Sequence, residues 1–291
     1  MPELARGMPV AFSVWVFVVG AVVGSFLNVV IARVPKGESI VAPRSRCPRC
    51  KSAIAWYDNI PLVSWLLLRA RCRNCGLPIS PRYPLVELLT GVLAVAVVSH
   101  AGATWTALAY FAFVAALVAL AYIDLDTWLL PHQITWPLLA AGLVSPLWNP
   151  RLSFLDAGIG AAGGFAGFAA IALFGEKILK RETMGWGDVW LLAGIGAWLG
   201  WPALLPVVLL SAVQGAIVGS ILIAFRREPE AAPPAEPVAA AEHKVQADDD
   251  WVPPKHAVPY GPFLSLAALE YFFFGDRLVS GWNSLLFRLL S

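Results

Sequence analysis

Long apolar runs separated by polar segments dominate the chain. Eight of these runs approach the length of about 17–25 residues that a helix needs to cross a bilayer. They cover residues 10–32, 84–103, 105–123, 134–149, 153–175, 188–200, 203–225 and 258–275. The pattern predicts an all-α polytopic membrane protein with about eight transmembrane helices. Prolines interrupt the run at 134–149 and glycines the run at 188–200, so we expect either to be tilted or to join a neighbour as a re-entrant pair.

The amino-acid composition also indicates a membrane protein. Hydrophobic residues make up 58% and charged residues 14% of the 291 residues, and the mean hydropathy is +0.69. An ordinary soluble domain has about 25% charged residues, so that class is excluded. The first apolar run exceeds the roughly 7–15 residues of a signal-peptide core and is interpreted as a retained anchor. We expect membrane lipid, and not nucleic acid, as a partner.

The positions of lysine and arginine predict the orientation of the chain. Basic residues are concentrated in residues 33–82, in the segment before Asp188 and after the seventh run. The other side has only Arg6, Arg151, Arg277 and Arg288. Because basic loops stay in the cytoplasm, we expect the N-terminus outside and residues 33–82 inside. The same rule places Asp124 and Asp188 at the cytoplasmic side.

Four cysteines form two Cys-x-x-Cys pairs in this cytoplasmic segment. The pairs are Cys47-Pro48-Arg49-Cys50 and Cys72-Arg73-Asn74-Cys75. Their spacing matches a tetrathiolate zinc site, whose closed ligand shell is typical of a structural ion. Disulfides are the alternative, and a reducing cytoplasm disfavours them. We therefore predict a small zinc-ribbon-like insert over residues 33–83 that folds around Zn²⁺ bound by Cys47, Cys50, Cys72 and Cys75.

Two aspartates lie at membrane boundaries. Asp188 follows Gly185 and Gly187 at the head of an apolar run, and Asp124 comes directly after the third run. A carboxylate at such a place is costly, and the cost suggests a function. Two converging aspartates can share a proton, so that one acts as a base on water while the other protonates the amide being cleaved. Asp126 is expected to face water or to cap a turn instead.

Alternative interpretations of these acids stay open. Either aspartate alone could cap a helix or pair with Lys177, Lys180 or Arg181, and the two together could hold Mg²⁺. A proton relay that includes Glu270 would indicate a transporter, and a zinc-ribbon scaffold without catalysis is a third hypothesis. Glu270 by itself is expected to hydrogen-bond a neighbouring helix. His132 is expected to pack or to cap.

The remaining segments complete the predicted organisation. The glycine-rich stretch 158–167 predicts close helix packing, and the tail 277–291 predicts an interfacial helix. The segment 228–257 is rich in proline, alanine and acids, which predicts a flexible cytoplasmic loop. The predicted units are a first transmembrane helix (1–32), the insert (33–83), a transmembrane core with both aspartates (84–227), the loop (228–257) and a last helix with its tail (258–291).

Several motifs, spread over most of the chain, carry a family resemblance. They are Gly24-Ser25-Phe26-Leu27-Asn28-Val29-Val30, the two cysteine pairs, Tyr57-Asp58-Asn59-Ile60-Pro61-Leu62-Val63-Ser64-Trp65, Arg82-Tyr83-Pro84-Leu85-Val86-Glu87, Ile123-Asp124 with Leu130-Pro131, the Gly-x-Gly-Asp stretch and Pro259-Tyr260-Gly261-Pro262-Phe263. With them the chain resembles the bacterial type IV prepilin peptidases, membrane aspartic proteases that are also N-methyltransferases. His132 and Trp190 depart from the acidic or amide residue and the lysine usual at these positions.

The resemblance implies a function. A leader peptide would be cut from type IV prepilins or pseudopilins at the cytoplasmic face of the bacterial inner membrane. The new N-terminus would then be methylated with S-adenosylmethionine. Asp124 and Asp188 fall on the family's two catalytic aspartates. No Gly-x-Gly-x-x-Gly nucleotide fold is available, because the glycine-rich stretch 158–167 lies inside an apolar span. Our hypothesis is that Asn28 and the 33–82 insert contribute to the methyl-donor site.

Overall fold

The computed structural model describes residues 8–180, 184–225 and 258–290. The helices are α1 (Val10–Arg33), α2 (Val63–Leu67), α3 (Arg82–Ala101), α4 (Trp105–Thr127), α5 (His132–Val144), α6 (Phe154–Phe174), α7 (Trp186–Leu199), α8 (Leu204–Phe225) and α9 (Gly261–Leu290). Short helical turns are η1 (Val34–Lys36), η2 (Trp56–Asn59), η3 (Ser145–Leu147), η4 (Gly175–Leu179) and η5 (Trp201–Ala203). The described residues otherwise form only two isolated β-bridges, so the predicted all-α fold is confirmed. The predicted loop 228–257 falls entirely outside these residues.

The eight predicted spans all correspond to helices. Within the described ranges, five helices are long and apolar enough to cross a membrane: α1 continued by η1, α3, α4, α6 continued by η4, and η5 with α8. α5 has 13 residues and α7 has 14, which gives each about 20 Å of length against a hydrocarbon core of about 30 Å. These are the two runs in which prolines and glycines interrupt the apolar pattern.

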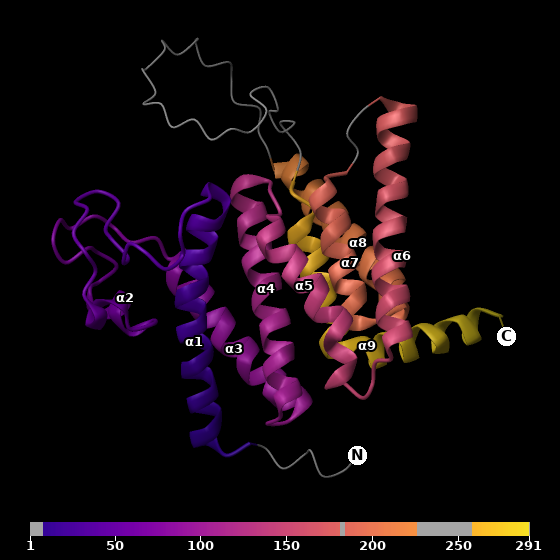
Figure 1. The fold of residues 1–291 in the computed structure, drawn as a ribbon, viewed down its shortest axis with the longest axis horizontal. Helices are drawn as coiled ribbons and strands as arrows, with labels where there is room; N and C mark the ends of the chain where they lie inside the picture. The colour runs from indigo at the N-terminus through magenta and orange to yellow at the C-terminus, as the bar shows by residue number, and fades with distance from the viewer. Residues whose placement is uncertain (1–7, 181–183, 226–257, 291) are drawn as a thin grey trace.

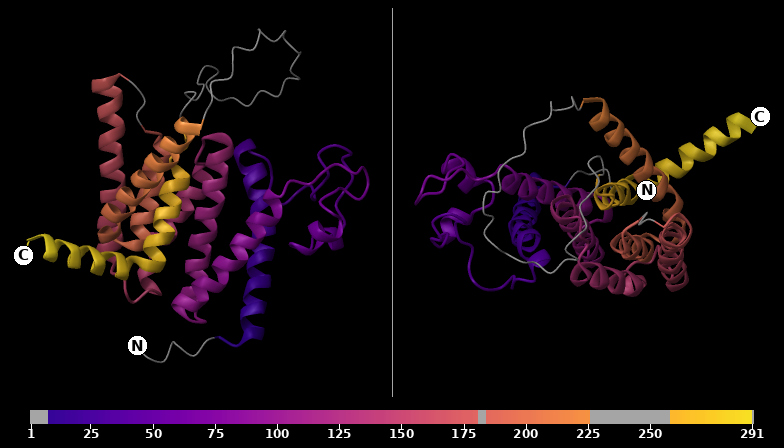
Figure 2. Two further views of the ribbon diagram at one scale, coloured as in Figure 1. Left: turned by 180° about the vertical axis from the view of Figure 1, so that it is seen from behind. Right: turned by 90° about the horizontal axis from the view of Figure 1, so that it is seen from above.

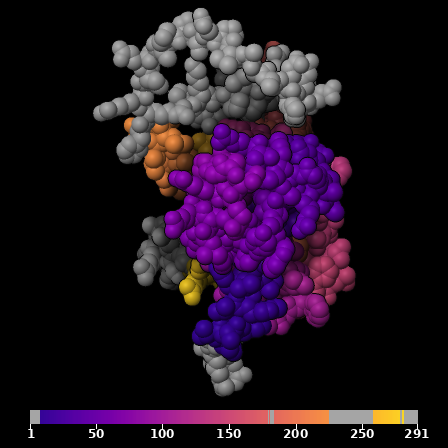
Figure 3. Space-filling view, turned by 90° about the vertical axis from the view of Figure 1, so that its left-hand side faces the viewer, coloured from indigo at the N-terminus to yellow at the C-terminus, as the bar shows by residue number. Residues whose placement is uncertain are grey.

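The bundle has two distinct ends. In Figure 1, α4 ends and both α7 and α9 begin toward the upper end, whereas α4 and α6 begin at the lower end. The C-terminal part of α9 turns away from the bundle and runs almost at right angles to it (Figures 1 and 2). That direction fits the interfacial helix predicted for the tail. The insert lies beside α1, outside the bundle, and forms much of the face seen in Figure 3.

The centre of the bundle is α7. Val189 and all residues from Leu191 to Trp198 are buried, because α6, α5, α8 and α9 pack around the helix. A helix that is apolar on every face is expected in such a position. By contrast, α8 exposes much of its apolar surface, including Ile217 and Ile221, as expected of a helix that faces lipid.

Glycines allow α6 and α7 to approach each other closely. A Cβ atom at Gly160 would collide with the Gly196 carbonyl oxygen, and one at Gly164 would lie 2.7 Å from the Leu192 carbonyl oxygen. Only glycine leaves room for this backbone contact. The close packing predicted from the glycine-rich stretch is therefore confirmed at these two positions.

Replacing Gly160 with alanine tests this contact. The added methyl group must push α6 away from α7, so we predict a loss of about 1–3 kcal/mol of stability. In detergent, the melting temperature should fall by several degrees. Gly158→Ala is the matched control, because it lies on the same helix with open space around it. Equal melting temperatures of the two variants would contradict the packing described here.

Candidate active site and metal centre

The last turn of α4 carries Asp124. The helix ends because Trp128 adopts a left-handed backbone conformation (φ 57°) and donates its N–H to the Asp124 carbonyl. The Asp124 side chain is buried. Its Oδ2 accepts a hydrogen bond of 3.0 Å from the N–H of Gly261, the first residue of α9. Asp124 therefore joins the end of α4 to the start of α9, and in this respect it does cap a helix.

The first turn of α7 carries Asp188. This helix begins after the N-cap residue Gly185, whose carbonyl accepts the Asp188 N–H at 3.1 Å. The side chain is half-buried, and within the described part of the chain its Oδ1 is buried without a hydrogen-bond partner. Buried polar atoms without a partner are rare. Oδ1 is therefore available to a proton, a water molecule or a substrate.

The two aspartates belong to one site. Their carboxylates are close enough to act on each other electrostatically, and Asp188 acts in the same way on Tyr260. They come from segments 64 residues apart, the end of α4 and the start of α7, which meet at the same end of the bundle (Figure 1). The structure brings Asp124 and Asp188 together, as the sequence predicted. Their catalytic role stays a prediction.

Leu130 and two glycines shape the space between them. The buried Leu130 side chain fills the position where Gly187 lacks a side chain: a Cβ there would lie 2.7 Å from Leu130 Cβ. A Cβ at Gly261 would lie 2.6 Å from Asp124 Oδ2. A larger residue at either glycine would move Leu130 or the carboxylate. The three segments that carry the site therefore approach one another only because these positions are glycine.

The other acidic and basic candidates lie elsewhere. Asp126 is exposed and forms an ion pair of 2.6 Å with Arg82. Glu270 accepts a hydrogen bond of 2.7 Å from Gln214 on α8, as predicted. Among the described residues, neither Lys177 nor Lys180 forms an ion pair with the aspartates. Arg181 falls outside the described residues.

His132 and Trp190 pack together instead of lying free at the site. His132 stacks on Trp136 with ring centroids 5.1 Å apart, and Trp190 meets the edges of Trp136 and Phe165. The prediction that His132 packs is therefore confirmed. An aromatic cluster occupies the position where the family pattern has a lysine.

Sequence reasoning assigned no role to Tyr260. Its hydroxyl forms a short hydrogen bond with Ser211 on α8, and it is the residue before Gly261, which binds Asp124. The motif Pro259-Tyr260-Gly261-Pro262-Phe263 was the signal for this residue, although without the fold nothing connected it to the aspartates. Tyr260 and Ser211 form the α8–α9 side of the site.

The four cysteines form one compact cluster. All four Sγ atoms lie within 4.8 Å of one another, and those of Cys47 and Cys75 are 3.7 Å apart. A tetrahedral ion with metal–sulfur bonds of 2.3 Å requires about 3.8 Å between sulfurs, whereas a disulfide requires about 2.05 Å. The cysteines are free thiols. The donor set therefore fits a single metal ion and not the disulfide alternative.

The two cysteine pairs have the same backbone geometry. The N–H of Lys51 donates to the Cys47 carbonyl and the N–H of Gly76 to the Cys72 carbonyl, each with positive φ at the donor. Hydrogen bonds with the Ser52 hydroxyl and with Asn74 lower the pKa of Cys50 to about 5. This environment favours thiolate at Cys50, and thiolate is the form that binds metal.

Polar contacts hold the insert to the bundle and to itself. Asp58 accepts two hydrogen bonds from the Arg73 guanidinium, at 2.8 and 2.6 Å, and Arg73 keeps the pKa of Asp58 below its ordinary value. The buried carboxylate of Glu87 on α3 accepts the Leu62 N–H at 2.8 Å. The Asn28 amide donates to the Tyr83 carbonyl. Glu87 therefore ties the insert to α3, and Asn28 ties α1 to α3.

Two parts of this chain match known protein families. Residues 18–101 match the Bacterial Peptidase A24 N-terminal domain, and residues 111–220 match the Type IV leader peptidase family. A Prepilin leader peptidase/N-methyltransferase of Myxococcus xanthus is 44% identical, over 92% of this chain and 91% of its own length. The Aeromonas hydrophila protein of the same name is 39% identical, over 95% of each chain. No solved structure matches the chain.

Metal analysis tests the cysteine cluster. We predict one tightly bound divalent ion per chain, measured by inductively coupled plasma mass spectrometry after extensive dialysis. Cys72→Ser should lower the content well below one, because it removes a ligand, whereas Arg69→Gln, exposed in the same insert, should not. Acid should release the ion, since protons compete for the thiolates. A metal content that is unchanged in Cys72→Ser would contradict a four-cysteine site.

Proposed function

The chain belongs to the type IV leader peptidase family, and from this membership we propose that it is a membrane aspartic endopeptidase. It removes the leader of type IV prepilins or pseudopilins and then methylates the new N-terminus. The names of the relatives support both activities. The observation that carries the aspartic mechanism is the meeting of Asp124 and Asp188, with an unpartnered Asp188 Oδ1.

One of Asp124 and Asp188 acts as the general base and the other as the general acid. Repulsion between neighbouring carboxylates favours a state in which the pair holds one proton. The ionised aspartate takes a proton from water, and the water oxygen attacks the scissile carbonyl carbon. The protonated aspartate gives its proton to the amide nitrogen as the C–N bond breaks. The pair again holds one proton, and no covalent intermediate forms.

The location of the site supports a cut at the cytoplasmic face of the inner membrane. The chain is a multi-pass membrane protein, and both aspartates lie at helix ends, where a bundle meets water. The basic residues of the insert support cytoplasmic orientation of this side. A prepilin has a basic leader before an apolar helix, so its scissile bond would lie at the depth of Asp124 and Asp188.

Zinc is the metal that the insert fits best. Four thiolates in a tetrahedral arrangement are typical of structural zinc, because they leave no open position for a substrate. Cys47, Cys50, Cys72 and Cys75 would hold the ion. Few residues of the insert are buried, so zinc would supply much of the free energy that folds it.

The methyl donor, S-adenosylmethionine, supplies an electrophilic methyl group when bound. We place its site where α1, α3 and the insert meet. Gly24 packs against Glu87 there, Asn28 binds the Tyr83 carbonyl, and Glu87 offers a buried carboxylate. A carboxylate suits both the cationic sulfonium and the ribose hydroxyls of this cofactor. Asn28 and Glu87 would therefore bind and orient it.

Intact mass of a prepilin substrate tests the two aspartates. With S-adenosylmethionine in detergent, the wild-type protein should yield a product that lacks the leader and carries one added methyl group. Asp124→Asn and Asp188→Asn should each lower the cleavage rate by about 10³-fold or more, because each removes one partner in proton transfer. Asp126→Asn is the matched control: it changes an exposed aspartate two residues from Asp124 and should keep most of the activity. Wild-type activity in either of the first two variants would refute the dyad.

Gly261→Ala tests the hydrogen bond to Asp124. The new Cβ would lie 2.6 Å from Asp124 Oδ2, so the carboxylate must move. A displacement of about 1 Å can cost roughly 10²-fold in rate, and we expect kcat to fall by that order while the protein still folds. Gly215→Ala on α8, where a Cβ meets only ordinary contacts with Phe263, is the control. Unchanged kcat in Gly261→Ala would show that Asp124 needs no fixed position.

A further inference from the structure

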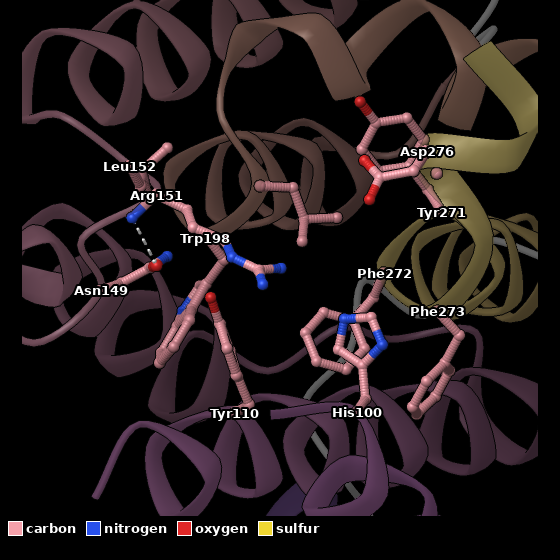
Figure 4. A pocket seen from close by; sticks show the side chains of 12 residues that line it. His100, Tyr110, Asn149, Arg151, Leu152, Trp198, Tyr271, Phe272, Phe273 and Asp276 are labelled. Atoms are coloured by element: carbon pink, nitrogen blue, oxygen red, sulfur yellow. Dashed lines mark hydrogen bonds between the residues drawn. The ribbon is translucent and has the colours of Figure 1, made fainter. Parts of the chain in front are cut away.

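A second polar site lies at the opposite end of the bundle from the aspartates. There the ends of α3 and α7, the start of α4, the segment before α6 and the bend of α9 line an open pocket of about 210 Å³. Figure 4 shows its side chains pointing into a common space. The residues used below are His100, Tyr110, Arg151, Trp198, Tyr271 and Asp276. None of them belongs to the proposed peptidase or metal sites.

Opposite charges face this pocket from different walls. The Arg151 guanidinium reaches into it from the segment before α6, and the Asp276 carboxylate enters from α9 (Figure 4). In the part of the chain that the structure describes, the two form no salt bridge with each other or with any other residue. Arg151 acts electrostatically on His100 and Tyr110, and Asp276 on His100 and Tyr271. An exposed cation and an exposed anion, neither in an ion pair among the described residues, therefore line one open pocket.

Aromatic rings line the space between the charges. Tyr110 and Phe272 meet with ring centroids 4.8 Å apart, and His100 lies 5.1 Å from Phe272. Trp198 closes the wall beside Tyr110. Tyr110, Tyr271 and Asn149 add uncharged hydrogen-bonding groups to this lining, and Arg151 and Asp276 supply its opposite charges.

This end of the bundle has the features of a membrane–water interface. Trp105 at the start of α4, Trp201 in η5 and Phe154 at the start of α6 are all strongly exposed. Exposed aromatic side chains at helix ends are typical of interfacial belts. The C-terminal part of α9 leaves the bundle at the same level (Figure 2). The pocket therefore lies at the depth of lipid headgroups.

We propose that this pocket binds the zwitterionic headgroup of a phospholipid, with its phosphate against Arg151 and its ammonium group against Asp276. One ligand then neutralises both unpaired charges. A purely anionic headgroup would satisfy Arg151 and leave Asp276 facing a negative charge. The proposal does not depend on the peptidase activity.

A competition between two phospholipids for the full-length wild-type protein tests the proposed headgroup site. Delipidated protein in detergent is offered phosphatidylethanolamine and phosphatidylglycerol with identical acyl chains, and bound lipid is counted by native mass spectrometry. We expect one retained molecule with about a tenfold preference for phosphatidylethanolamine, since one charge-assisted hydrogen bond is worth about 1.5 kcal/mol. Equal retention, or a preference for phosphatidylglycerol, would overturn the proposal. So would displacement of the lipid by an equal concentration of free phosphoethanolamine, which would indicate a soluble ligand.

Variants assign the two charges. Asp276→Asn should remove the preference for phosphatidylethanolamine, whereas Asp276→Glu, which keeps the carboxylate, should retain it. Arg151→Gln should lower the retention of both lipids by about tenfold. Arg277→Gln, which changes the exposed neighbour of Asp276 outside the pocket, should have no effect. A preference that survives in Asp276→Asn would overturn the assignment, and if a variant does not fold, the wild-type competition decides.

Discussion

The structure depends on how closely the neighbours of α7 can approach its backbone. This helix is too short to span a bilayer by itself, and it is buried along almost its whole length. Gly160 and Gly164 bring α6 into contact with its carbonyl groups, and Gly142 brings α5 against Ala197 and Trp198. Dispersion contacts replace the hydrophobic effect as the source of helix association in lipid, and they require such short distances. Because α7 is held in this way, its first turn has a fixed position.

The proposed active site is built from helix ends and not from helix faces. Asp124 is on the last turn of α4, Asp188 is on the first turn of α7, and the Gly261 N–H comes from the first residue of α9. Helix ends have free backbone donors and acceptors and lie near water. A peptide bond at the membrane surface can reach them without crossing the bundle. The fixed contact of Leu130 with Gly187 keeps these ends together.

The two ends of the bundle have different chemistry. One end holds the carboxylate pair and, beside α1, the cysteine cluster that Glu87 ties to α3 through Leu62. The other end holds Arg151 and Asp276 in an aromatic pocket. The helices α4, α7 and α9 contribute to both ends, and α9 carries Gly261 at one end and Asp276 at the other.

The sequence alone determined the helices, the cysteine pairs and the two aspartates. Apolar run length depends only on local composition, and the Cys-x-x-Cys spacing already limits the geometry of each pair, so these features need no tertiary information. Tertiary structure decided what lies between distant segments. It placed Gly261 and Tyr260 beside aspartates that lie more than 70 residues earlier in the chain. It paired Asp126 with Arg82, and it brought Arg151 and Asp276 to one pocket. Those contacts follow from helix packing, which side-chain patterns within a single run do not specify.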